Sequence, residues 1–199
     1  MKSNVCKIEN GTKDLEAILR ESERVAEYNG LTHKQTLQLR LLCEEIDGML
    51  PNIIDDFDGD LWIEYESGVC KVNVSIQIPA FNTSKKEELI NIAKNKKNAA
   101  AVGIVGKIRS AIENFFLSEE LADAFSASSA VYGMATDYSG YVDYSYIWSL
   151  EQYRNTVKKE ERTEAWDELE KSVIACVADD VIVGVKGNRA DIIIVKNFA

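Results

Sequence analysis

The stretch DLWIEYESGVCKVNVSIQI, residues 60–78, decides the fold class that the sequence predicts. Apolar and polar side chains alternate on both sides of Ser67-Gly68. Such alternation is typical of a strand with one buried face, and a short turn with glycine joins two such strands into an antiparallel hairpin. The side chains expected on the buried face are Leu61, Ile63, Tyr65, Cys70, Val72, Val74, Ile76 and Ile78.

Two helices are predicted upstream of this hairpin. In the first, apolar residues recur at helical spacing from residue 12 to the stop signal Asn29-Gly30. The second opens with a capping box from Thr32 to Gln35, continues one apolar face, and is expected to end at Pro51. Each helix therefore offers an apolar face that a sheet can cover.

Downstream, the segment KNAAAVGIVGKIRSAIENFF, residues 97–116, places Gly103 and Gly106 in a loop before a helix expected to start at Lys107. Glycine lets backbone N–H groups approach a phosphate, and a helix N-terminus attracts anions. The spacing matches neither GxxxxGK[ST] nor GxGxxG. Two interpretations stay open, a phosphate-binding loop or a small-residue hinge before a core helix, and we favour the hinge.

The remaining segments complete an α+β chain. Residues 124–148 are rich in Ser, Tyr and Gly without a clean period, which indicates an ordered, irregular insertion. A short helix is predicted over residues 84–93, another from a cap at Ser149, a further helix from Trp166 to Val177, and a closing hairpin about Gly187-Asn188. We therefore predict one domain over residues 1–199, a mostly antiparallel sheet with helices on one face.

Composition restricts the function classes. The net charge of -10, from 23 Lys and Arg against 33 Asp and Glu, opposes a nucleic-acid partner. No apolar run approaches the roughly 20 residues that span a bilayer, and the start MKSNVCKIENG lacks the apolar core of a signal peptide. We expect a cytoplasmic protein without a membrane partner.

Cysteine and histidine give little support to metal or nucleophilic chemistry. Cys6, Cys43, Cys70 and Cys176 form no CxxC pair, and the last three lie in apolar patterns, so buried thiols are expected rather than a zinc site. The only histidine, His33, falls in the first turn of the second helix, where an exposed side chain is expected rather than a base.

Residues 31–78, together with the closing hairpin 181–196, resemble the GHKL ATPase fold shared by gyrase, MutL, histidine kinases and the anti-sigma serine kinases, the last being nearest in style. The segment LQLRLLCEEIDGML, residues 37–50, is similar to the family helix LRLALEEALTNA. In that family the glutamate activates water, and an asparagine four residues later holds magnesium. The match puts Glu45, beside Glu44, at the glutamate position and Met49 at the asparagine position. A thioether is a poor ligand for magnesium.

The other two family motifs are only partly present. The strand that leads to the adenine-binding DxGxG in the family ends here in SIQIPAFNTSKK, where Asn82 is the one nearby polar side chain that could take the aspartate's role. The glycine-rich lid, similar to GxGLGLxIV, is approached by VGIVGKIRSAI. The resemblance implies that Gly103 and Gly106 would offer N–H groups to phosphates and that Lys107 would add charge.

The resemblance implies a two-layer GHKL or Bergerat-like sandwich and two alternative functions. One is a bacterial regulatory or signalling protein that has lost or weakened its ATP motifs and binds a protein partner, for which the Tyr-rich segment and Trp62 are suited. The other is a working ATP- and magnesium-binding regulator, a weak ATPase or serine kinase, in which Glu45 orients water. An unrelated α+β fold, with Glu44 and Glu45 on a solvated helix face, is a third possibility.

Overall fold

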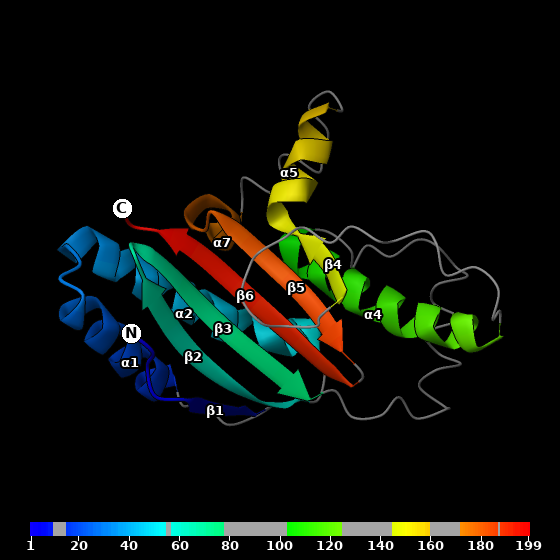
Figure 1. Cartoon of the computed structure of the whole chain (residues 1–199), viewed down its shortest axis with the longest axis horizontal. Coiled ribbons are helices and arrows are strands. Elements are labelled where there is room, and N and C mark those ends of the chain that lie inside the picture. Colours follow the sequence, from blue (N-terminus) through cyan, green and yellow to red (C-terminus); the bar gives the residue numbers. More distant parts are fainter. Residues whose placement is uncertain (10–14, 55–56, 78–102, 125–144, 160–171, 187) are drawn as a thin grey trace.

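The computed structural model describes residues 1–9, 15–54, 57–77, 103–124, 145–159, 172–186 and 188–199 (Figure 1). In these residues six strands form one antiparallel sheet in the order β1-β2-β3-β6-β5-β4. Helix α2 runs behind the sheet in Figure 1, while α1 lies at its left side and α4 extends beyond its right side. The predicted α+β class, an antiparallel sheet with helices on one face, is confirmed.

The two predicted hairpins form the centre of the sheet. Strands β2 (Asp58–Glu66) and β3 (Val69–Gln77) make the first, β5 (Asp180–Lys186) and β6 (Arg189–Asn197) make the second, and β3 pairs with β6 to join them. Ser67 and Gly68 have φ angles of 50° and 87°. Positive φ at both central residues is the geometry of the tight turn that suits the twist of a hairpin.

Both edges of the sheet differ from the sequence prediction. Strand β1 (Cys6–Glu9) pairs with β2 and was not predicted, because four residues are too few to establish a period. Strand β4 (Ser145–Ser149) pairs with β5 and occupies the end of the segment expected to be irregular. The rest of that segment, residues 125–144, and the helix predicted over residues 84–93 lie outside the described residues.

Helices α1 (Leu15–Tyr28) and α2 (His33–Ile53) confirm the two upstream predictions. The capping box is present, because the Thr32 side chain accepts from the N–H of Gln35 and the Gln35 side chain accepts from the N–H of Thr32. The end predicted at Pro51 is wrong, since α2 continues to Ile53. Ile53 is buried in the core, and this burial offsets the one hydrogen bond that a proline so near the helix end removes.

Helix α4 (Gly103–Ala124) begins earlier than predicted, so Gly106 and Lys107 lie inside it and not in or after a loop. The physical reason is that Ile104, one turn before Ile108, extends the apolar stripe toward the N-terminus, and both side chains are buried. Helix α5 (Leu150–Lys159) starts at the predicted cap, where Gln152 N–H donates to Ser149 Oγ at 3.2 Å.

The last helix is shorter than expected. Helix α7 (Val173–Val177) starts at its own N-cap, Ser172, whereas the first part of the helix predicted from Trp166 to Val177 lies outside the described residues. Its side chains Ile174 and Ala175 are buried, which leaves Cys176 on the exposed side of the turn. The expectation that Cys176 is buried is therefore wrong, while Cys43 and Cys70 are buried as predicted.

The hydrophobic core lies between the sheet and the helices. Every second residue of β2, β3, β5 and β6 points into it, and α2 supplies the longest apolar face. The largest fully buried side chains include Ile18, Leu39, Ile46, Leu61, Ile108 and Ile192. Within the described residues, none of the helices has the length and hydropathy needed to cross a bilayer.

Candidate functional site

Glu44 belongs to an ion-pair network between α1 and α2. Arg40 Nε lies 3.1 Å from Glu44 Oε1, and Arg40 Nη1 lies 2.6 Å from Glu23 Oε1 on α1. The hydrogen bond from Arg40 to Glu44 raises the pKa of the guanidinium. All three side chains are well exposed, so the network adds little to stability. For Glu44 the arrangement favours the solvated helix face over a ligand-binding role.

Glu45 lies on a different flank of α2. Successive helical residues are turned by about 100°, so Glu45 faces away from the side on which Arg40 and Glu44 meet α1. Glu45 is half-buried, and among the described residues it has no hydrogen-bond or ion-pair partner. At the end of the same flank, two turns on, the Asn52 carbonyl accepts from Arg109 Nη1 of α4 at 3.5 Å. The flank that carries Glu45 therefore ends beside α4.

Met49 stands one turn beyond Glu45 and points into the core. Its side chain is 6% exposed and belongs to the same cluster of buried residues as Ile46 and Ile53. A buried thioether offers no oxygen to a hard cation, and magnesium prefers carboxylate, amide and water oxygens. No group of three or more His, Cys, Asp or Glu in the described part of the chain is arranged to hold a metal ion.

The start of α4 contains the three residues proposed to bind phosphate. Gly103 has a φ of 76°, in the left-handed region, and is followed by Gly106, which is buried, and Lys107. The first N–H groups of a helix have no partner within the helix, so this turn can in principle face an anion. The Lys107 ammonium, however, lies 5.4 Å from the ring centroid of Tyr153 on α5, in a cation–π contact.

The structure brings some of the predicted residues together and leaves others unplaced. Helices α2 and α4 pack against each other, so Glu45 and the Gly103 turn belong to neighbouring elements. Arg109 of α4 both pairs with Glu113 at 2.8 Å and reaches the Asn52 carbonyl. Asn82 lies outside the described residues.

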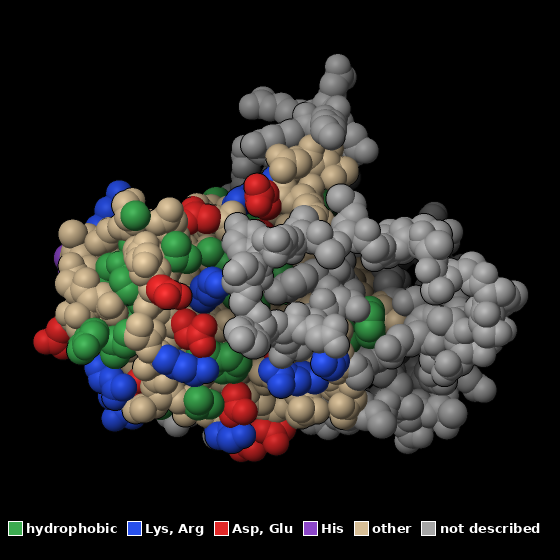
Figure 2. Space-filling model, viewed as in Figure 1, with side chains coloured by type: hydrophobic (Ala, Val, Ile, Leu, Met, Phe, Trp, Pro, Cys, Tyr) green, Lys and Arg blue, Asp and Glu red, His purple; other side chains and the backbone are tan. Residues whose placement is uncertain are grey.

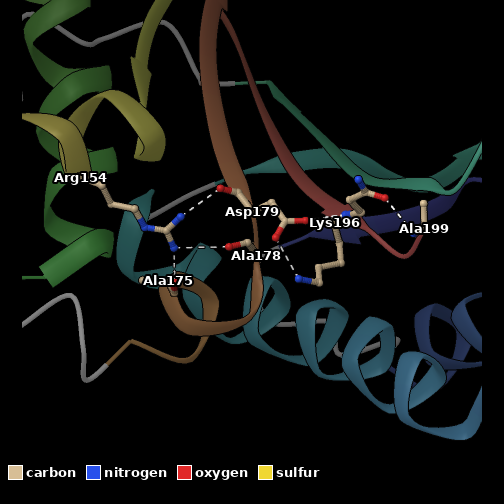
Figure 3. A network of polar contacts seen from close by, with 7 residues as sticks. Arg154, Ala175, Ala178, Asp179, Lys196 and Ala199 are labelled. Carbon is tan, nitrogen blue, oxygen red and sulfur yellow. Dashed lines mark hydrogen bonds and ion pairs between the residues drawn. The ribbon is translucent and has the colours of Figure 1, made fainter.

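A polar network near α5 and α7 was not found from the sequence (Figure 3). Arg154 of α5 donates to the carbonyl oxygens of Ala175, Ala178 and Asp179, the last at 3.0 Å. The Asp179 carboxylate in turn accepts from Lys196 Nζ at 2.9 Å and from the Asn197 N–H at 2.6 Å. Because Arg154 satisfies carbonyls at the end of α7, the network fixes two helices to the end of β6.

Asp180 extends this anchoring to the start of α5. Its Oδ1 accepts from the N–H of Glu151 at 2.9 Å and from the N–H of Val181 at 2.8 Å. Burial raises the pKa of the Asp180 carboxyl, and the two hydrogen bonds act against that rise. The cluster has the bonding pattern of a structural anchor, since these hydrogen bonds all join groups of the chain itself.

The sheet face opposite the helices carries Trp62. Its indole N–H donates to Glu64 Oε1 at 2.8 Å, and Lys2 Nζ lies 4.5 Å from the ring centroid while pairing with Glu64 at 3.2 Å. Figure 2 shows apolar side chains on the described part of this face scattered among basic and acidic ones, without a broad apolar patch. Trp62 is therefore held by neighbours on its own face.

A search of protein-family models, of curated proteins and of solved structures found no match to this chain. The GHKL resemblance accordingly stays a prediction. It rests on the motif around Glu45, on the partial glycine motif at Gly103, and on the order in which these elements follow one another.

Proposed function

We propose that this chain is a GHKL-like regulator that has lost ATP hydrolysis and acts through contact with a protein partner. The order of elements supports the relationship: α2 with Glu45, the β2–β3 hairpin, the glycine-bearing start of α4, and the closing β5–β6 hairpin. The observation that carries the loss of hydrolysis is Met49, buried at the position where the resemblance requires a magnesium-holding asparagine.

Two charge-neutralising groups would be needed for ATP hydrolysis at this site. The transferred phosphoryl group is stabilised chiefly by metal ions and by positioned cations. The position of Met49 supplies no metal ligand, and Lys107 is turned toward Tyr153 of α5. Glu45 alone could orient a water molecule but could not offset the charge that develops on the phosphoryl oxygens.

A second candidate, an ATP-binding regulator with weak ATPase or kinase activity, is favoured by Glu45 itself. A half-buried carboxylate without a partner among the described residues is available to a ligand. The neighbouring α4 begins with N–H groups that can face phosphate oxygens. In this alternative Gly103, Gly106 and Lys107 would hold the phosphates, and Lys107 would first have to leave Tyr153.

Glu45→Gln distinguishes the two candidates, because it removes the carboxylate and keeps the shape of the side chain. We expect the purified wild-type chain to show the same ATP turnover as Glu45→Gln, at the background level of the assay. In its host, the phenotype of a strain that lacks the protein should be complemented by Glu45→Gln as well as by the wild type. Equal melting temperatures of the two proteins provide the control for folding.

Turnover by the wild type that Glu45→Gln abolishes would favour the ATPase alternative. Loss of complementation by a Glu45→Gln protein that melts like the wild type would also contradict the proposal, because a partner-binding regulator does not need this carboxylate for catalysis. A partner that binds the wild type and Glu45→Gln with equal affinity would support it.

A further inference from the structure

The sheet face opposite the helices carries a row of polar side chains across three neighbouring strands. Asp60 of β2 is in register with Ser75 of β3, and Ser75 is in register with Asp191 of β6. The residue that follows each of them in the chain belongs to the core, so these three side chains point to the opposite face. Residues directly opposite each other in antiparallel strands have Cβ atoms about 4.5–5.5 Å apart. The row therefore places the Ser75 hydroxyl between two carboxylates.

Asp191 is the member of this row whose hydrogen bonding is incomplete. The residue is 6% exposed, and its Oδ1 accepts from Arg189 Nε at 3.0 Å. Its Oδ2 is buried without a hydrogen-bond partner. Gly184 stands opposite Asp191 on β5 and has no side chain that could supply a donor. Because a buried oxygen without a donor destabilises a fold, such an atom is normally satisfied by the chain, by water or by a ligand.

Asp60 and Ser75 add two further groups that a ligand can use. Asp60 Oδ1 is buried without a well-aligned hydrogen bond, although Lys7 Nζ lies 2.8 Å away. The Lys7 side chain is 77% exposed, so this ion pair adds little to stability. The Ser75 hydroxyl has no partner among the described residues. The row thus offers acceptors on both sides of a hydroxyl that can donate.

The charges along this row are already balanced, which decides the class of ligand. Arg189 pairs with Asp191 at 3.0 Å. Lys7 pairs with Asp60 at 2.8 Å. A further cation between the two carboxylates would be repelled by both of these basic groups. The row therefore lacks neutral donors, and a hydroxyl fits because it can donate to a carboxylate oxygen while it accepts from Ser75 Oγ.

We propose that this row binds a neutral polyhydroxyl compound such as a sugar. One hydroxyl donates to Asp191 Oδ2 and accepts from Ser75 Oγ, and a neighbouring hydroxyl donates to Asp60. The ligand enters when the Lys7 side chain, which reaches the solvent, moves aside. Trp62 lies two residues beyond Asp60 on the same face and adds the aromatic flank that small-molecule sites commonly have. The site is on the sheet face away from α2 and α4, so it does not depend on the proposed function.

Titration of the isotope-labelled chain with myo-inositol, D-glucose and D-mannose, followed by amide NMR, tests this site. We expect at least one of these probes to give saturable shifts of the Ser75 and Asp191 amide signals at millimolar concentration. Asp191→Asn should weaken this binding about tenfold, because Arg189 holds the remaining oxygen and an NH₂ group replaces Oδ2. Asp58→Asn removes an exposed carboxylate on the same face of β2 and is the matched control, which should leave the affinity unchanged.

Ser75→Ala provides a second variant, so the test does not depend on the folding of one protein. It removes only the hydroxyl and should also weaken the binding. Shifts that do not saturate with any of the three probes, or that Asp191→Asn and Ser75→Ala leave unchanged, would overturn the proposal. Saturable binding of methylammonium at the same amides, without binding of the neutral probes, would overturn it as well, because the row would then take a cation.

Discussion

Replacing Gly103 with alanine is expected to destabilise the fold, whereas the same change at Gly48 is expected to stabilise it. Gly103 starts α4 with a φ of 76°, where a residue with a Cβ costs about 1–2 kcal/mol. Gly48 is exposed inside α2 without a positive φ, and alanine is favoured there by about 1 kcal/mol. A Cβ added at either position meets no atom within 4 Å, so neither difference contains a clash or a packing gain.

The two variants make a matched pair for differential scanning calorimetry. In a chain of 199 residues, 1 kcal/mol shifts the melting temperature by about 2–4 °C. We expect the melting temperature to fall for Gly103→Ala and to rise for Gly48→Ala. A Gly103→Ala protein that melts at or above the wild-type temperature would refute the left-handed start of α4.

Three further outcomes test other parts of the structure. When the folded protein is treated with a maleimide at pH 8, only Cys176 should react. Burial raises the pKa of the Cys70 thiol to about 12 and shields Cys6 and Cys43 from the reagent. Reaction of all four cysteines before the protein unfolds would contradict the burial of these three in the core. Arg154→Ala should lower the free energy of unfolding in urea by about 1–3 kcal/mol, because it leaves backbone carbonyls without a donor. Arg154→Lys should restore only part of this free energy, since an ammonium cannot reproduce the contacts of the planar guanidinium. A loss below about 0.5 kcal/mol for Arg154→Ala would argue against the network. The pKa of Asp180 in the folded protein lies above its ordinary 3.8, so this group's contribution to the free energy of unfolding falls as pH rises from 3.8 through the raised pKa. Over that pH range the free energy of unfolding of Asp180→Asn in urea should therefore increase relative to that of the wild type. A difference between the two proteins that does not change with pH would contradict this expectation.

The sheet could be predicted from the sequence where its pattern is long. In β2 and β3, the alternation over residues 61–66 and 70–78 left one register for a hairpin with a buried face. Strand β1 has four residues, and its pairing with β2 depends on a neighbour that is distant in sequence. The predicted stop at Pro51 failed for the same reason, because burial of Ile53 is a tertiary effect.

The candidate site was less accessible to sequence reasoning. Glu44 and Glu45 are adjacent and chemically alike, and the i,i+4 spacing of Arg40 and Glu44 in one helix is the signal that could have set Glu44 apart. Only the packing of α1 against α2 shows that Arg40 also meets Glu23. The contacts of Arg154 leave no pattern in the sequence, because its acceptors are backbone carbonyls that any residue supplies. Likewise, the contact between Lys107 and Tyr153 depends on where α5 lies beside α4.

The most direct test of the proposed loss of magnesium-dependent ATP chemistry is a calorimetric titration with a non-hydrolysable ATP analogue in the presence and absence of Mg²⁺. The wild type is measured beside Met49→Leu, which keeps an apolar side chain in the core. The account predicts no Mg²⁺-dependent binding to the wild type or to Met49→Leu up to millimolar analogue. Wild-type binding that strengthens when Mg²⁺ is added would contradict it.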